Sequence, residues 1–424
     1  MALARLLISK LGPMGDGIHQ GRRERVYLDR GLPGDEVRAR IKTDSFGVAR
    51  GEILEFIEAS QFRQVAPCEH FDYCGNCTLQ HAKENFYRRW KIDLVKEFFK
   101  KQGLEPRQWK EPVFVGNYER RRVTFSALKQ ANNLTVGYYK RRSKEIHTID
   151  SCLIAHPHLL AIREKIQPYL KTILSSGKPV DIFLQKLGES GDMVFTGPLG
   201  STGKPEEKVL QVLKEFFKVC PLVSRVSWRS DERAEIKTLI SRGAMTASFG
   251  NLKVNLPPAA FLQPTASGEK ALVEGVMKAL PERGKFADLF SGCGTFAGSM
   301  LKKGSVDAYE SVPQAIAALK NADGENAKAL KTFRRNLFTN PLRRDEINRY
   351  DAVVFDPPRA GCPEQAMQMA GSKCKTLIGV SCNPLTFARD AAILCERGHR
   401  LQSLQVVDQF MWSHHVEVIG VFTR

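Results

Sequence analysis

The last third of the chain alternates apolar runs, each long enough for one buried strand, with stretches of helical periodicity. In residues 263–424 these runs are KFADLF, VDAYES, YDAVVFDPP, KTLIGVSC and VEVIGVF. Strands that alternate with helices form a parallel sheet covered on both faces, so each strand is apolar on both sides. We therefore expect a multidomain α/β protein whose residues 263–424 form a doubly wound, Rossmann-like domain.

The first 262 residues show two other patterns. Residues 1–57 alternate short β-like runs with Gly-rich turns, which predicts a small β-barrel or, alternatively, a solvated appendage of hairpins. Residues 58–262 begin with clustered cysteines and continue with a helical stripe from Leu79 to Gly103. The strands of a mainly antiparallel sheet follow. A chain of 424 residues is too long for one core, so we predict three domains, 1–57, 58–262 (α+β) and 263–424.

Basic residues outnumber acidic ones by 18, and the excess is concentrated in four runs that also contain aromatic residues. The runs are YRRWK (87–91), KEFFKKQG (96–103), ERRRV (119–123) and YYKRRSK (138–144). Cationic side chains neutralise phosphates and aromatic rings stack on unpaired bases, so a nucleic acid is the expected partner. Solvated helix and strand faces are the alternative. No apolar run approaches ~18 residues and MALARLLISKL is a poor signal peptide, so we expect a cytoplasmic protein.

A glycine-rich turn follows one of the predicted strands. It comprises residues 292–297 after Asp288, and Glu310 ends the next strand, where its carboxylate could accept hydrogen bonds from ribose hydroxyls. Glycine permits a tight turn and a close approach of the backbone to a ligand. The pattern fits both NAD and S-adenosylmethionine, and a bare tight turn is a third interpretation.

Two further strand ends carry rigid or reactive groups. Asp356 precedes Pro357 and Pro358, whose fixed φ angles form a ledge for a planar base, unless they only end the strand. Cys382 ends the next strand, at the edge where open α/β sheets bind ligands. A thiolate is a nucleophile, whereas a buried cysteine is usually inert. A nucleophilic role requires an electropositive setting, which the following helix N-terminus could supply, and a base, for which Glu417 is a candidate.

Ten cysteines in a chain expected in the cytosol do not indicate a disulfide framework. Three of them, Cys68, Cys74 and Cys77, are grouped closely enough to bind zinc or an iron–sulfur cluster together with a fourth ligand. The residue types alone leave these two metals open, and chance grouping is the weaker alternative.

Together these motifs resemble those of the RNA 5-methyluridine methyltransferases, in the family's order and over nearly the whole chain. The matching elements are FLQPT (261–265), DLFSGCGTF (288–296), DPPRAG (356–361), SCNP (381–384) and HVE (415–417). At the front, LPGD (32–35) is similar to part of the TRAM domain, a small RNA-binding barrel. Residues 68–77 together with Cys152 are similar to the family's four-cysteine iron–sulfur site.

The resemblance, which is to the bacterial 23S rRNA type, implies transfer of a methyl group from S-adenosylmethionine to carbon 5 of a uridine in RNA. It implies that Cys382 adds to the uracil ring and that Glu417 removes a proton. The implied ligands of a 4Fe–4S cluster are Cys68, Cys74, Cys77 and Cys152. The implied cofactor contacts are Gln263, Phe290, Thr295, Glu310, Asn336 and Asp356. Thr295 and Thr265 stand where the family commonly has Asn.

Three alternatives accompany this hypothesis: a tRNA substrate, methylation of an exocyclic amine with Cys382 as a packing residue, and a non-catalytic RNA-binding assembly factor. The amine hypothesis expects an aromatic residue after the double proline, where this chain has Arg359. A radical methylthio-transferase is disfavoured because its Cys-x3-Cys-x2-Cys spacing is absent. We expect a monomer without an obligate protein partner.

Overall fold

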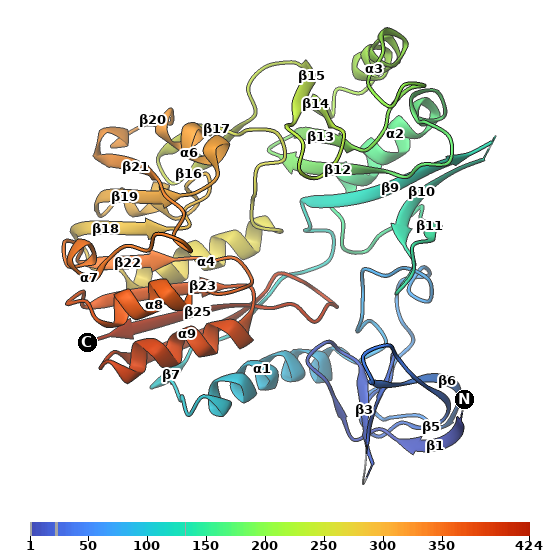
Figure 1. Cartoon of the computed structure of the whole chain (residues 1–424), viewed down its shortest axis with the longest axis horizontal. Helices are drawn as coiled ribbons and strands as arrows, with labels where there is room; N and C mark the ends of the chain where they lie inside the picture. Colours follow the sequence, from blue (N-terminus) through green and yellow to red (C-terminus); the bar gives the residue numbers. More distant parts are fainter. Residues whose placement is uncertain (1, 22–23, 132) are drawn as a thin grey trace.

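The computed structural model describes residues 2–21, 24–131 and 133–424, whose strands form four sheets (Figure 1). The largest sheet has nine strands, comes mainly from the C-terminal third of the chain and lies at the left of Figure 1. A seven-stranded and a six-stranded sheet lie at the right. Among the helices of these residues, none is long and apolar enough to cross a membrane.

The nine-stranded sheet has the order β21-β19-β18-β22-β23-β25-β24-β7, and β8 also pairs with β24. Its strands are β7 (Gln108–Trp109), β8 (Val113–Phe114), β18 (Gly284–Leu289), β19 (Gly304–Glu310), β21 (Leu330–Arg334), β22 (Ala352–Phe355), β23 (Thr376–Ser381), β24 (Arg400–Asp408) and β25 (Glu417–Thr423). The strands from β21 to β23 are parallel, and β25 is antiparallel to both of its neighbours. The expected α/β sheet is therefore confirmed, with an antiparallel β24–β25 pair added to it.

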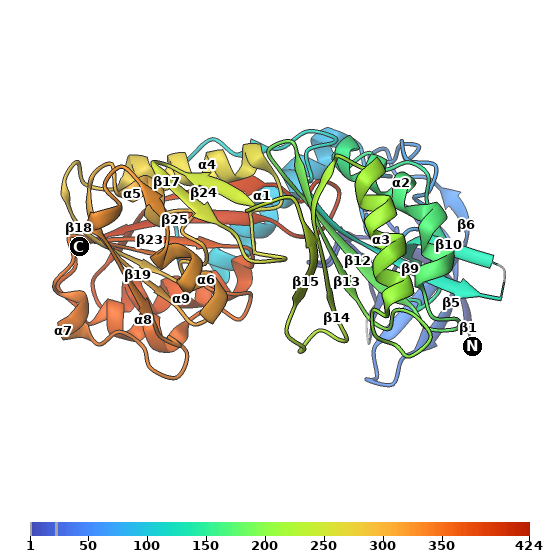
Figure 2. The same cartoon turned by 90° about the horizontal axis from the view of Figure 1, so that it is seen from above.

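Helices cover both faces of this sheet because its strands are apolar on both sides. One core contains Phe286 of β18 and residues of α4 (Ala266–Ala279), α5 (Ala297–Met300) and α6 (Pro313–Lys320). The opposite core contains Leu289 of β18. Its helices are α1 (Glu84–Lys101), α7 (Arg344–Ile347), α8 (Pro363–Ala370) and α9 (Pro384–Glu396). Figure 2 shows α4 on one side of the sheet and α8 and α9 on the other.

Helix α1 and strands β7 and β8 come from early in the chain but pack on the nine-stranded sheet. The helix contacts α9, and both short strands pair with β24 in parallel. The predicted helical stripe began at Leu79, whereas α1 begins at Glu84, because the N–H of Leu79 is bonded to the carbonyl of Trp412. Gly103, at φ +68°, follows the helix end as predicted.

The seven-stranded sheet has the order β11-β10-β9-β12-β13-β14-β15 and is mainly antiparallel, as predicted, with one parallel pair, β13 and β14. Its strands are β9 (Arg122–Gln130), β10 (Asn133–Tyr139), β11 (Ile146–Thr148), β12 (Val180–Leu187), β13 (Ser190–Thr196), β14 (Val223–Arg229) and β15 (Lys237–Ser241). Helices α2 (Pro157–Ile173) and α3 (Glu207–Val219) contribute to its core.

The six-stranded sheet at the front of the chain has the order β1-β5-β6-β4-β3-β2 and a core of its own. Its strands are β1 (Ala2–Leu7), β2 (Lys10–Leu11), β3 (Gly17–Gln20), β4 (Arg25–Leu28), β5 (Glu36–Thr43) and β6 (Ala49–Glu58). Ion pairs from Arg30 to Asp72 and from Arg141 to Asp29 connect it to the rest of the chain.

A three-stranded sheet completes the described architecture. It consists of β16 (Thr246–Phe249), β17 (Leu252–Asn255) and β20 (Asp323–Gly324), and the 3-10 turn η1 (Ala327–Ala329) follows β20. Apolar side chains of β16 and β17 belong to the same core as α4. This sheet therefore extends the packing on one face of the nine-stranded sheet.

Candidate active site

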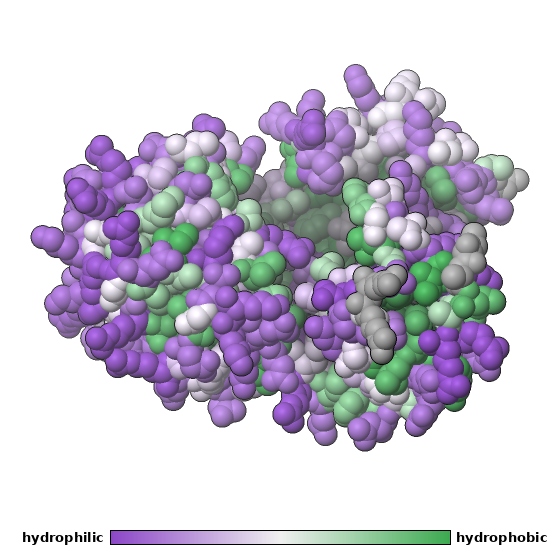
Figure 3. Space-filling view, turned by 60° about the horizontal axis from the view of Figure 1, so that its bottom comes forward, coloured by the Kyte–Doolittle hydropathy of each residue, from purple (hydrophilic) through white to green (hydrophobic). Residues whose placement is uncertain are grey.

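A cavity of about 1560 Å³ lies between the nine-stranded and the seven-stranded sheets. We call the parts of the molecule that contain these two sheets its two lobes. Figure 3 shows the molecule hollowed between them. One end of the cavity is lined by the loops that follow β18, β22 and β23, and the other end by the cysteine-bearing loop 68–77. The strand order reverses between β18 and β22. The cavity therefore opens where doubly wound sheets bind their ligands.

Cys382 follows β23 directly and lines this cavity, half-buried. The turn that presents it is fixed by its neighbours. The backbone N–H of Asn383 donates to Ser381 Oγ at 3.1 Å, and the Asn383 side-chain amide donates to the carbonyl of Arg359 at 2.8 Å. The thiol thus lies between β23 and α9, and the loop after β22 is held beside it.

Carboxyl groups dominate the electrostatic setting of Cys382. Burial, followed by the carboxyl groups of Glu417 and Asp356, raises the pKa of the thiol to about 12. Arg359 acts in the opposite direction but does not outweigh them. The electropositive setting that a nucleophilic thiol requires is therefore not supplied by the neighbours of Cys382 alone, because the strand ends that approach it carry carboxyl groups.

Glu417 and Asp356 form a buried pair of carboxyl groups. Glu417 is the first residue of β25, and Asp356 follows the last residue of β22. Burial raises the pKa of Glu417 to about 8 and that of Asp356 to about 7, and the charge of Asp356 adds to the effect on Glu417. Carboxyl groups that interact this strongly titrate as a pair. A proton acceptor that titrates near neutral pH suits general base catalysis.

Gln409 connects this pair to the segment that precedes α4. Its Nε2 donates to Gln263 Oε1 at 2.6 Å and to Glu417 Oε1 at 3.2 Å, while Gln263 Nε2 lies 3.5 Å from Asp356 Oδ2. Both glutamine side chains are buried. Gln409 was not among the predicted site residues, because its position directly after a strand is the only signal that it carries.

The glycine-rich turn connects β18 to α5. Gly292 N donates to Glu310 Oε2 at 2.9 Å, and Glu310 Oε1 accepts from Ser311 N at 2.6 Å and Val312 N at 2.8 Å. Gly292 has φ +55°, and a Cβ there would meet nothing within 4 Å, so a ligand can approach the backbone closely. Phe290 has φ +62°, which is strained for a residue other than glycine. This open, strained turn fits a nucleoside-containing cofactor.

Most of the expected cofactor contacts line the cavity, namely Gln263, Phe290, Thr295, Glu310 and Asp356. Asn336 does not line the cavity. The Asn336 side chain is exposed, and its Oδ1 accepts from Phe338 N at 3.0 Å, while Phe338 itself lines the cavity. Thr265 is buried and caps α4, because its Oγ1 accepts from Gly268 N at 3.1 Å. Asn can also cap a helix, so Thr265 retains this local function.

The four cysteines of the expected metal site, Cys68, Cys74, Cys77 and Cys152, line the far end of the cavity. Burial raises the pKa of Cys74 to about 11 and also raises those of Cys68 and Cys77. The charges of neighbouring thiolates raise these pKa values further. A bound cation would offset this repulsion. The all-sulfur donor set fits zinc or an iron–sulfur cluster.

Two arginines of the ERRRV run hold the segment that carries Gln263. Arg121 Nε donates to Gln263 O at 2.9 Å, and its Nη2 lies 2.5 Å from Glu269 Oε2. Arg122 Nη1 donates to Leu262 O at 2.8 Å. These side chains join the two lobes, whereas the sequence predicted phosphate contacts for the run, because a run of basic residues does not reveal its internal partners.

The chain is similar over its length to known proteins. A family model described as tRNA (Uracil-5-)-methyltransferase matches residues 250–424. An uncharacterised RNA methyltransferase of Brucella suis is 34% identical, covering 99% of this chain and 97% of the relative. A 23S rRNA (uracil(1939)-C(5))-methyltransferase of Shewanella sp. (strain ANA-3) is 27% identical, covering 98% and 94%. The Pyrococcus abyssi tRNA (uracil-54, C5)-methyltransferase, solved with S-adenosyl-L-homocysteine, has the same fold, with a TM-score of 0.73, 20% identity and 99% coverage of both chains.

Proposed function

Because the chain belongs to the RNA (uracil-5-)-methyltransferase family, whose members use S-adenosylmethionine, we propose that it methylates a specific uridine of 23S ribosomal RNA through a covalent Cys382–uracil bond. The observation that carries the mechanism is that Cys382, Glu417 and the glycine-rich turn line one cavity. A nucleophile, a proton acceptor and a cofactor-type turn thus face the same space. The target uridine has to leave its base stack to reach them.

Cys382 acts first in the proposed reaction. Its thiolate forms a bond to carbon 6 of uracil, and the electrons of the 5,6 double bond move to the oxygen at carbon 4, which gives an enolate that is nucleophilic at carbon 5. S-adenosylmethionine, when bound, supplies the electrophilic methyl group that carbon 5 accepts. Since burial raises the pKa of the thiol to about 12 and Arg359 lowers it, we assign Arg359 the role of stabilising the reacting thiolate.

Glu417 acts second. Its ionised carboxylate removes the proton from carbon 5, the electrons re-form the 5,6 double bond, and the Cys382 thiolate leaves. The hydrogen bond from Gln409 favours the ionised form of Glu417, against the effect of burial on its pKa. Gln409 therefore supports the step as a positioning residue.

The experiment that tests this mechanism uses RNA that contains 5-fluorouridine. Fluorine cannot leave carbon 5 as a cation, so the covalent adduct survives denaturation. We expect an adduct with the wild type and with Cys395→Ala, a control on α9, but neither adduct nor methylation with Cys382→Ala. Full methylation by Cys382→Ala would contradict the proposal.

The proposed RNA substrate rests on the relative named for 23S rRNA, which is similar over 98% of this chain. The family model and the solved structure are named for tRNA instead, so tRNA is the second candidate. Maps of 5-methyluridine in both RNAs from cells with and without the gene decide between them. A non-catalytic assembly factor would leave both maps unchanged.

We also propose that Cys68, Cys74, Cys77 and Cys152 hold a 4Fe–4S cluster rather than zinc. All four donors are thiols on one wall of the cavity, and their order resembles the family's iron–sulfur motif. The cluster would cross-link two loops and orient RNA. Protein purified without oxygen should contain about four iron and four sulfide per chain, and Cys68→Ser should lose both. Stoichiometric zinc without sulfide would contradict this proposal.

The division into three domains is part of the same proposal. Residues 1–57 would form a TRAM-like RNA-binding barrel, residues 58–262 an α+β domain that adds an RNA-binding surface, and residues 263–424 the methyltransferase domain. We propose a cytoplasmic monomer without an obligate protein partner. Sedimentation of the purified protein tests its oligomeric state.

A further inference from the structure

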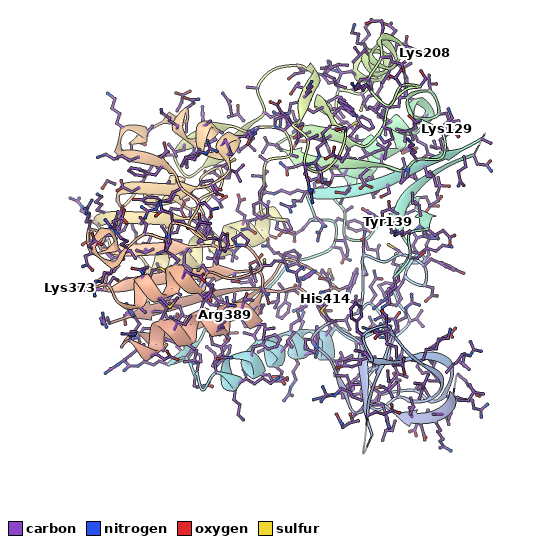
Figure 4. All side chains as sticks on the ribbon, viewed as in Figure 1. Lys129, Tyr139, Lys208, Lys373, Arg389 and His414 are labelled. Carbon is purple, nitrogen blue, oxygen red and sulfur yellow. The ribbon has the colours of Figure 1, made fainter. Side chains whose placement is uncertain are left out.

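Residues 409–416, which we call the connector, join β24 to β25 and end immediately before Glu417. His414 lies on the connector at the edge of the space between the lobes (Figure 4). Gln409 at its start donates to Glu417 at 3.2 Å, so the two ends of the connector meet beside the proposed base. The position of Glu417 therefore depends on how the connector is held.

Lys91 of α1 holds the connector near both of its ends. Its Nζ lies 2.8 Å from Asp408 Oδ1 and donates to the carbonyls of Phe410, at 3.3 Å, and His415. The Lys91 side chain is 0% exposed and that of Asp408 2%. In such a buried pair neither charge can turn to water, so the geometry is fixed.

A second set of bonds holds the middle of the connector to α1 and to the residues after Cys77. Tyr87 Oη donates to Asp408 and accepts from Trp412 N at 2.9 Å. The Trp412 carbonyl accepts from Thr78 N at 2.8 Å and from Leu79 N at 3.0 Å. The backbone of Trp412 is thus bonded on both sides.

The Trp412 side chain is buried against Cys77 and Phe71. Its backbone has φ +56°, a conformation that a non-glycine residue keeps only when its surroundings impose it. Phe71 and Cys77 belong to the loop 68–77, which carries cysteines of the proposed metal site. We call the surface that these two residues offer to Trp412 its seat.

We propose that Trp412 and Tyr87 are positioning residues for Glu417, so that the seat formed by the Cys77 loop couples the metal site to proton removal from carbon 5. The inference rests on the proposed function of Cys382 and Glu417. Loss of the seat displaces Glu417, while Cys382 and the glycine-rich turn, which belong to other strands, keep their places.

The test uses the full-length, metal-loaded enzyme with ordinary uridine RNA and a labelled methyl donor. When proton removal is slowed but methyl transfer is not, methylated RNA stays bonded to the protein. We expect Trp412→Leu and the milder Tyr87→Phe to lower kcat about tenfold and to accumulate about tenfold more denaturation-stable, labelled adduct, with kcat/KM for RNA changed less than about twofold. Trp109→Leu, a control on β7, should accumulate no adduct.

Glu417→Gln serves as the reference, because it removes the base itself. Adduct with Glu417→Gln but not with Trp412→Leu or Tyr87→Phe would overturn this inference and leave the proposed function intact. No adduct with any variant, Glu417→Gln included, would overturn both. A rise in KM without adduct would show a merely structural role and would also overturn the inference.

The coupling to the metal site has a readout that is independent of activity. Removal of the metal should change the tryptophan fluorescence of the wild type, because it loosens the seat of Trp412. The same treatment should leave the fluorescence of Trp412→Phe nearly unchanged. Identical responses of the two proteins would overturn the coupling.

Discussion

Gln409 Nε2 donates a hydrogen bond to Glu417 Oε1 at 3.2 Å, across the gap between the end of β24 and the start of β25. The same amide donates to Gln263 Oε1 at 2.6 Å, so one side chain connects the proposed base to the segment before α4. All three side chains are buried, so water does not readily replace a lost bond. The donor favours the ionised form of Glu417, against the effect of burial.

Replacement of Gln409 by Met is expected to raise the pKa of Glu417, because Met has a similar length but donates no hydrogen bond. The rising limb of the pH profile of kcat should move to higher pH, and kcat near neutral pH should fall about tenfold. The matched control is Gln405→Met on the preceding strand β24, where the Gln405 amide donates to the carbonyl of Glu111. A profile unchanged by Gln409→Met would show that Gln409 does not tune Glu417.

The wild-type enzyme should become more active as the pH rises through neutrality. Burial raises the pKa of Glu417 to about 8 and that of Asp356 to about 7, and only the ionised carboxylate accepts a proton. Because proton removal follows methyl transfer, kcat should therefore increase across this interval. Methyl incorporation measured in buffers of constant ionic strength checks this. A flat profile would argue against a carboxylate base.

Glu417→Gln should abolish turnover and yet stabilise the fold at alkaline pH. The pKa of Glu417 is raised from 4.5 to about 8 in the folded protein. Its favourable contribution is therefore fully present below about 4.5 and is lost as the pH rises through about 8. Gln has no charge to bury, so the variant should gain roughly 1–3 kcal/mol of unfolding free energy above that pH.

Thermal unfolding followed by calorimetry checks this prediction at alkaline and at acidic pH. The difference between Glu417→Gln and the wild type should shrink toward acidic pH. Glu396→Gln, an exposed position at the end of α9, is the control and should show no pH-dependent difference. A variant less stable than the wild type at alkaline pH would contradict the direction.

The strand ends explain why much of the site was predictable. Each parallel strand is buried on both faces and therefore forms an apolar run in the sequence. The strands Ala352–Phe355 and Thr376–Ser381 could be recognised from such runs. The carboxyl ends of parallel strands meet at one edge, which places Asp356 and Cys382 together. Both residues line the cavity.

The parts of the site that depend on distant contacts could not be predicted. Lys91 belongs to a basic run, yet it is fully buried and paired with Asp408, which lies 317 residues further along the chain. The helix places Lys91 on the same face as Tyr87 and Leu94, and that face packs on the sheet. Charge alone does not reveal this orientation. The position of Asn336 could not be predicted either, because no local pattern shows that its side chain is exposed.

Cys382 should react slowly with iodoacetamide in the absence of RNA. Burial, Glu417 and Asp356 together raise the pKa of its thiol to about 12, so little thiolate is present near neutral pH. Asp356→Asn removes one of these charges and should speed alkylation of Cys382 several-fold. Peptide mass spectrometry over time measures the rate, with the exposed Asp323→Asn as the control. Slower alkylation of Asp356→Asn would contradict the sign.

Arg121→Ala should affect the cofactor more than RNA binding. The guanidinium is enclosed by Glu269 and by the carbonyl of Gln263, with 15% of the side chain exposed, so phosphates have little access to it. The variant should raise the KM for S-adenosylmethionine about tenfold, because the Gln263 segment loses its support.

A contacted phosphate contributes about one unit to the slope of RNA affinity against salt concentration. This slope should stay unchanged in Arg121→Ala. Lys144→Ala, which removes an exposed cation of another basic run, provides the comparison. A smaller slope for Arg121→Ala would show that Arg121 binds RNA instead of joining the two lobes.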